Sequence, residues 1–294
     1  MVARIVVPVD GSDRCLAALG PARALAEQLG VPLRVLSVVA EGKEDTVRRN
    51  EVNAAMHRLG LDAAEVQVVS ADSPAHRILL ETQTEEGILV CMTSHARGAL
   101  TELVLGSVSS EILRRAHRPL VITGPRLSVH WHGPVRSLVV CLDSSTQAEV
   151  ALNHALDLGR QLGASIHLLH ASLEHIHGGP ETGEDGSDWL TGSDWHTGAF
   201  GEVPSVASAE EDPYWERLRQ RAEQIRAESG LETEWQVVYR PNAPTAVTDY
   251  ADTVPGAMVV TGTHGRSSLE RLVLGSFATA LIRGAGCPVM VVSS

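Results

Sequence analysis

The sequence predicts an α/β protein of two tandem domains, each with a five-stranded parallel sheet covered by helices on both faces. Three observations indicate this fold. The chain repeats itself at long range, its strand-length apolar runs lack the alternation of a half-exposed strand, and Ala- and Leu-rich helical stretches separate these runs. Parallel strands that are buried on both faces and joined by crossover helices have this pattern.

The repeat begins with the first apolar run. Residues 4–12 (RIVVPVDGS) resemble residues 137–145 (SLVVCLDSS), and each run ends in an aspartate followed by small residues. A helical stretch and a glycine that can end it follow at the same offset of about 133 residues: Cys15–Leu29 with Gly30, and Ala148–Leu162 with Gly163. Each half therefore begins with a strand that leads into a helix.

Apolar runs and turn residues place the remaining strands. We expect strands near residues 5–9, 33–39, 65–69, 88–92 and 119–123, and then near 138–142, 166–171, 234–239, 257–261 and 288–292. The domains are predicted at residues 1–125 and 134–294. We expect the halves to pack through their last strands, because pairing would cover two apolar edges.

An insertion distinguishes the second half. Residues 97–107 (RGALTELVLGS) match residues 266–276 (RSSLERLVLGS) at an offset of about 169, so the second half has about 36 additional residues. They fall at about 174–212, and residues 178–212 are acidic and contain no Lys or Arg. This composition predicts a loop that acts as a mobile lid or a partner-docking segment, in which Trp189, Trp195 or Phe200 could stack on an adenine.

The overall composition limits the class of protein. The chain has 294 residues, 44% hydrophobic and 20% charged, with a formal net charge of −12, which is typical of a folded protein and disfavours nonspecific binding to nucleic acid or anionic lipid. The first apolar run reaches Asp10 too early for a signal peptide, and no apolar stretch has the roughly 18 residues of a membrane span. The four cysteines are widely separated, so we expect reduced thiols and a cytoplasmic location.

A glycine motif follows the fourth strand of the second half. Gly262 and Gly265 are three residues apart, and Gly275 and Ser276 come after nine further residues, which gives the spacing G-x2-G-x9-G-[ST]. Glycines after a buried strand let backbone N–H groups approach phosphate oxygens, and a following helix N-terminus favours an anion. Arg266 would add positive charge. The motif predicts a phosphate-binding site.

Asp143 completes this prediction. It ends the first strand of the second half, and the carboxyl ends of strands one and four lie at the same edge of such a sheet. A carboxylate there can accept hydrogen bonds from ribose hydroxyls.

The Asp-ended first strand, the spaced glycines and the final Cys287-Pro288-Val289 strand together resemble the universal stress protein family in its tandem two-domain form. The resemblance covers the chain except for the insertion, and it implies a Rossmann-like (HUP) fold and binding of ATP, with or without Mg²⁺. It also implies roles for individual residues. The adenine and ribose end would be lined by Cys141, Asp143 and Ala171, and the ribose and phosphates would be surrounded by Gly262, Gly265, Gly275, Ser276 and Phe277.

The first half departs from this pattern. Thr93 and Ala96 occupy the positions of Gly262 and Gly265, and an added Cβ hinders close phosphate approach. Four cofactor-binding candidates remain there: Asp10, Val38, Gly106 and Ser107. A weakened site and an inactive site are both consistent with this sequence.

Other chemistry finds little support. The only lysine is Lys43, which excludes a P-loop with its G-x4-G-K-[ST] motif, and we identify no catalytic residues. Six histidines, at positions 130, 132, 167, 170, 175 and 177, make a metal site conceivable, but we expect none. We therefore expect an ATP-binding regulatory protein that acts on an unknown protein partner. Slow ATP hydrolysis, a nucleotide-independent scaffold and a homodimer stay open as alternatives or additions.

Overall fold

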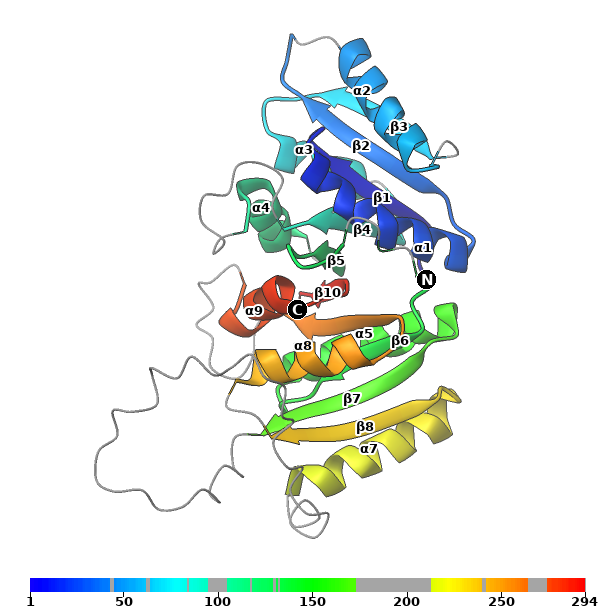
Figure 1. Cartoon of the computed structure of the whole chain (residues 1–294), viewed down its shortest axis with the longest axis vertical. Helices are drawn as coiled ribbons and strands as arrows, with labels where there is room; N and C mark the ends of the chain where they lie inside the picture. Colours follow the sequence, from blue (N-terminus) through cyan, green and yellow to red (C-terminus); the bar gives the residue numbers. More distant parts are fainter. Residues whose placement is uncertain are drawn as a thin grey trace, which may run out of the picture.

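The computed structural model contains one sheet of ten strands that runs through both halves of the chain (Figure 1). It describes residues 1–42, 45–61, 64–83, 85–94, 105–116, 118–128, 131, 133–172, 213–239, 242–263 and 274–293. The predicted insertion, including its tryptophans, lies outside the described residues.

All ten predicted strands are confirmed, and helices connect them as expected. The first half has β1 (Arg4–Val9), the 3₁₀ helix η1 (Asp13–Ala18), α1 (Leu19–Leu29), β2 (Leu33–Val39), α2 (Asp45–Arg58), β3 (Glu65–Ser70), α3 (Pro74–Gln83), β4 (Ile88–Thr93), α4 (Ser107–Arg115) and β5 (Leu120–Thr123). The second half has β6 (Ser137–Cys141), α5 (Thr146–Leu162), β7 (Ser165–Ser172), α7 (Pro213–Ser229), β8 (Thr233–Tyr239), α8 (Ala243–Thr253), β9 (Ala257–Gly262), α9 (Ser276–Gly284) and β10 (Val289–Val292).

The strand order shows how the two halves join. It is β3-β2-β1-β4-β5-β10-β9-β6-β7-β8, so each half has the same internal order, read outward from the centre. All neighbours within a half are parallel, whereas β5 and β10 pair antiparallel, with Met290 opposite Val121. The expected packing through the last strands is therefore present, as hydrogen-bonded pairing of β5 with β10. We call this junction the seam.

Helices cover both faces of the sheet because consecutive strand residues point to opposite faces. In β1, Ile5 and Val7 belong to an apolar cluster that includes residues of α1, α2, α5 and α7, whereas Val6 belongs to a second cluster that includes residues of α3, α4, α8 and α9. Each of these two apolar clusters contains residues from both halves. The core is therefore continuous across the seam.

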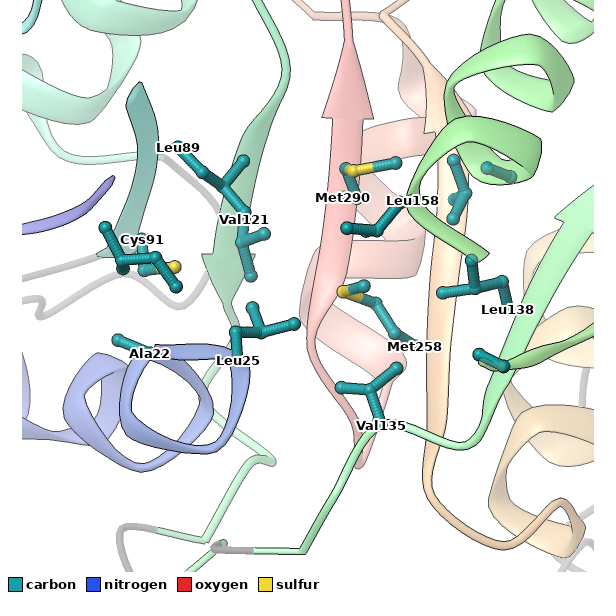
Figure 2. Packing of buried hydrophobic residues seen from close by; sticks show 14 of the residues in the cluster. Ala22, Leu25, Leu89, Cys91, Val121, Val135, Leu138, Leu158, Met258 and Met290 are labelled. Carbon is teal, nitrogen blue, oxygen red and sulfur yellow. The ribbon is translucent and has the colours of Figure 1, made fainter. Parts of the chain in front are cut away.

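Side chains from both halves meet on one face of the seam. Figure 2 shows Leu25 and Val121 of the first half facing Met258 and Met290 of the second, with Val135 of the connecting segment beside them. All five are at most 2% exposed. This apolar contact supports the β5–β10 pairing from one side of the sheet.

The first helix of the first half differs from the expectation. One helix was predicted over Cys15–Leu29, but η1 ends at Ala18 and α1 begins at Leu19. Pro21 explains the break because it has no N–H to donate to the preceding turn and fits only the first turn of a helix. The corresponding α5 has no proline and continues unbroken from its Ser145 cap, whose side chain accepts from the Ala148 N–H at 3.2 Å.

A buried histidine on β7 predicts a pH dependence of stability. The Nδ1 of His167 lies 3.0 Å from the Tyr250 hydroxyl and its Nε2 lies 3.2 Å from Ser165 Oγ. Burial lowers the pKa of His167 from its ordinary value, and the charges of Glu234 and Glu232 oppose this effect.

We expect the free energy of unfolding to fall on acidification. The unfolded chain titrates near the ordinary histidine pKa of about 6.5 and the folded chain below it, so between these values the unfolded state binds more protons. Stability from His167 is full above about pH 7 and is lost as the pH falls through the folded pKa. Urea unfolding of wild type and His167→Gln between pH 7.5 and pH 5 should give a shallower slope for the variant. An unchanged slope would contradict this assignment.

Candidate functional site

The predicted site residues of the second half gather at one edge of the sheet. Strands β9, β6 and β7 are parallel neighbours, with Val260 paired to Val140 and Cys141 paired to Leu169. Their carboxyl ends therefore lie side by side, and Gly262, Asp143 and Ala171 occupy or directly follow these ends. This edge is where parallel α/β sheets bind ligands.

Asp143 is held in a defined orientation. Its Oδ1 accepts from the Ser145 N–H at 2.9 Å, across a turn in which Ser144 has a φ of +62°. A positive φ is uncommon for a residue other than glycine, so this turn is specific. The other carboxylate oxygen, Oδ2, has no hydrogen bond to any residue that the structure describes, and it can accept from a ligand.

Cys141, the last residue of β6, and His170 on β7 lie close to this turn. Burial raises the pKa of the Cys141 thiol to about 12, so the thiol is neutral at pH 7 and unsuited to act as a nucleophile. His170 Nδ1 lies 2.7 Å from the carbonyl oxygen of Leu142, which can only accept, so Nδ1 carries the proton. The ring also stacks on Tyr214, with centroids 3.9 Å apart.

The second glycine pair of the motif begins α9. The Gly275 N–H donates to the Thr263 carbonyl at 2.7 Å, which ties the start of the helix to the end of β9. Ser276 is exposed and Phe277 is partly buried at this N-terminus. Helix N-termini favour anions because their first N–H groups lack helical partners. Gly265 and Arg266 lie outside the described residues.

Gly262 makes a close contact that its sequence position did not indicate. A Cβ built at Gly262 would lie 3.0 Å from the Cβ of Gln147, in the first turn of α5. A larger residue at position 262 would therefore crowd the packing of α5 against β9. The Gln147 Oε1 is buried and has no hydrogen-bond partner, so it is a further acceptor at this edge. In the sequence, only its position four residues after Asp143 could have indicated that Gln147 lies at this edge.

The first half repeats the backbone arrangement of the second. The Gly106 N–H donates to the Ser94 carbonyl at 2.9 Å, as Gly275 does to Thr263. Asp10 Oδ1 accepts from the N–H and the hydroxyl of Ser12, at 2.9 and 2.6 Å. Val38 lies near the end of β2 and Ser107 begins α4. The structure brings these elements to the carboxyl edge of β4, β1 and β2.

Arg48 distinguishes the first half, and sequence reasoning missed it. A cavity of about 490 Å³ lies between the end of β1 and α2, and Arg48 lines it. The Arg48 guanidinium donates to the Asp10 carbonyl at 2.9 Å and occupies the space where a Cβ on Gly11 would lie. Aligning α2 with α7 on the glycines that follow them places the buried Leu218 at this position in the second half. The contact is tertiary, so local pattern could not reveal it.

Comparison with known proteins identifies the family. The sequence model of the family described as "Universal stress protein family" matches residues 1–124, 134–188 and 193–293. The chain belongs to the universal stress protein family. A universal stress protein of Mycobacterium tuberculosis strain H37Rv is 26% identical over 98% of this chain and 96% of its own length.

Solved structures of the family have the same fold. The crystal structure of a universal stress protein from Archaeoglobus fulgidus aligns with 99% of this chain and 98% of its own chain, with a TM-score of 0.62 and 19% sequence identity. One from Pseudomonas aeruginosa, described as a putative universal stress protein, covers 99% of this chain and 93% of its own, with a TM-score of 0.58 and 16% identity. The tandem fold of the chain is therefore a fold of this family.

The described part of this universal stress protein offers neither a metal-binding cluster nor a membrane-spanning helix. Within the described ranges, no group of three or more His, Cys, Asp or Glu side chains is placed to hold a metal ion. His130, His132, His175 and His177 lie outside these ranges. Over the same part of the chain, none of the helices combines the length and apolar character needed to cross a membrane.

Proposed function

We propose that this universal stress protein binds ATP in its second half, at the carboxyl edge of β9, β6 and β7, and that occupancy of the site regulates its contacts with a protein partner. The observation that carries the proposal is the oriented carboxylate of Asp143 at the same edge as Gly262 and the N-terminus of α9. An acceptor at one end and a helix N-terminus at the other match the two ends of a nucleotide.

The surroundings of this edge support binding rather than covalent chemistry. Cys141 is neutral, and the Ser276 hydroxyl has no base beside it among the described residues. In this proposal Cys141 and Ala171 border the adenine, and Gly275, Ser276 and Phe277 border the phosphates. Gly265 and Arg266 would complete the phosphate end, with or without Mg²⁺.

The first half is proposed to bind nucleotide more weakly. Thr93 ends β4 where Gly262 ends β9, and Arg48, which aligns with the buried Leu218 of the second half, lies beside Asp10. Thr93 adds a side chain and Arg48 adds a charged group at the first-half edge that corresponds to the proposed ligand edge of the second half. Two sites of equal affinity per chain would contradict this proposal.

The test uses a conservative change of Asp143. In Asp143→Asn the side-chain carbonyl can still accept from the Ser145 N–H, so we expect the turn to persist while the charge-assisted acceptor for a ribose hydroxyl is lost. Calorimetry with ATP and with adenosine, on protein stripped of bound ligand, should show about tenfold weaker binding of both. Adenosine has no phosphate, so a lower affinity for adenosine in Asp143→Asn measures the loss of the ribose contact without any contribution from the phosphates.

Asp10→Asn is the matched control, and we expect it to change affinity by less than about threefold. Absence of any heat with stripped wild type would refute nucleotide binding and favour a nucleotide-independent scaffold. Phosphate release from ATP that disappears in Ser276→Ala would favour the alternative of a slow hydrolase.

A further inference from the structure

A second cavity, of about 770 Å³, lies at the seam and adjoins the carboxyl end of β4 in the first half, where Thr93 and Ser94 line it. Its walls come from both halves: η1 and the ends of β4 and β5 on one side, and the start of α8 and the end of α9 on the other. The volume lies within the range of small-molecule sites, which is roughly 300–1,000 Å³. We call it the seam cavity.

The described lining of the seam cavity carries positive charge only. Arg14, Arg126 and Arg283 line it, and no described lining residue is acidic, in a chain whose formal net charge is −12. Arg126 is anchored, because its guanidinium donates to the Gly284 carbonyl and lies 3.2 Å from Asp252 Oδ2. Neither Arg14 nor Arg283 forms an ion pair with a described residue. Two guanidinium groups are therefore available to a ligand.

Uncharged donors face the same space. Thr123 ends β5 and is 1% exposed, and its Oγ1 has no hydrogen-bond partner although the residue lines the cavity. A buried hydroxyl without a partner is unfavourable, and an acceptor in the cavity would satisfy it. The first turn of α8 also lines the cavity, with Asn242 as its cap and Thr245 beside it. Its N-terminus favours an anion.

The internal repeat does not produce a second copy of this arginine cluster. At the offset that relates Asp10 to Asp143, Arg14 corresponds to Gln147. Arg126 lies in the connection between β5 and β6, which occurs once in the fold. Only Arg283, in the last turn of α9, has a counterpart, Arg114 in the last turn of α4. The cluster is therefore not a general feature of both halves.

We propose that the seam cavity binds a small anion carrying two or more phosphate groups. Guanidinium groups pair with phosphate in a forked, two-bond geometry, and the cavity is larger than a single phosphate requires. The site is distinct from the nucleotide site proposed in the second half, because Arg283 and Ser276 lie at opposite ends of α9, about 11 Å apart along the helix axis.

Calorimetric titration of the full chain with inorganic pyrophosphate tests the proposal. We expect binding to wild type, and an association constant about tenfold lower in Arg14→Gln and in Arg283→Gln, because each variant removes a charged donor. Arg114→Gln removes the same charge at the matched position of α4 and should leave the affinity unchanged. Binding should also weaken between 50 and 300 mM salt.

Three results would overturn the proposal. Wild type could show no pyrophosphate binding, Arg114→Gln could weaken binding as much as Arg283→Gln, or binding could be lost in Gly275→Val while persisting in Arg283→Gln. The last result would place pyrophosphate at the proposed nucleotide site. Because ATP binding is measured separately through Asp143→Asn, failure of either proposal leaves the other intact.

Discussion

Replacing Gly275 with valine is expected to lower the affinity for ATP at least about hundredfold, which corresponds to about 2.8 kcal/mol at 25 °C. Gly275 caps α9 and is buried, with a φ of −64° that any residue can adopt. The backbone therefore tolerates valine, but a branched side chain would fill the space through which phosphate oxygens approach the first N–H groups of the helix. Calorimetry on stripped protein measures the loss.

The first half supplies a closely matched control. Gly106 caps α4 with a φ of −56° and makes the equivalent bond to the carbonyl of Ser94. Gly106→Val should cost the fold as much as Gly275→Val, by about 1 kcal/mol for loss of a favourable cap, and should leave the tight ATP site unchanged. Equal loss of ATP affinity in both variants would mean that the nucleotide does not reside chiefly in the second half.

Introducing a charge at the seam is expected to destabilise the whole chain. Val121 is 0% exposed on β5, opposite Met290 of β10. Val121→Asp would bury a carboxylate among apolar side chains from both halves, and we expect it to reduce the free energy of unfolding by more than about 4 kcal/mol. Because the core is continuous across the seam, both halves should lose structure together when urea unfolding is followed by circular dichroism.

Val47→Asp is the control for the same change of side chain. Val47 is 54% exposed on α2, so the substitution should alter stability by no more than about 0.5 kcal/mol. If Val121→Asp instead left one half fully folded while the other melted, the halves would be independent folding units. The seam would then contribute little to stability.

The sequence predicted the fold well because the deciding signals are local or repeated. The central strands β1, β4, β5, β6, β9 and β10 are mostly apolar runs, and Gly30 and Gly163, both with a φ of +64°, end their helices as expected. The break before α1 was missed, although Pro21 is a local signal for it. The apolar pattern of residues 15–29 continues through this break, and periodicity alone therefore joined the two segments.

The candidate site was only partly predictable. The positions of Asp143 and Gly262 followed from their place at strand ends, which the structure brings to one edge, while their proposed roles in binding stay predictions. Arg48 and Gln147 were not found, because each acts through a contact with a residue that is distant in the sequence. An arginine on a helix is most often solvated, and no local pattern marks one that turns toward a strand end.

The antiparallel pairing of β5 with β10 joins two halves of the same chain. The connection from Thr123 to Ser137 holds them at an effective concentration on the order of millimolar or higher, so their association does not depend on how much protein is present. In a dimer of identical subunits, a substitution changes both sides of the two-fold axis at once. Here a substitution can change one half alone. Three such differences occur at corresponding positions of the two halves: Thr93 and Gly262, Arg48 and Leu218, and Arg14 and Gln147. Covalent fusion thus keeps two related halves, which differ at these positions, at a fixed one-to-one ratio.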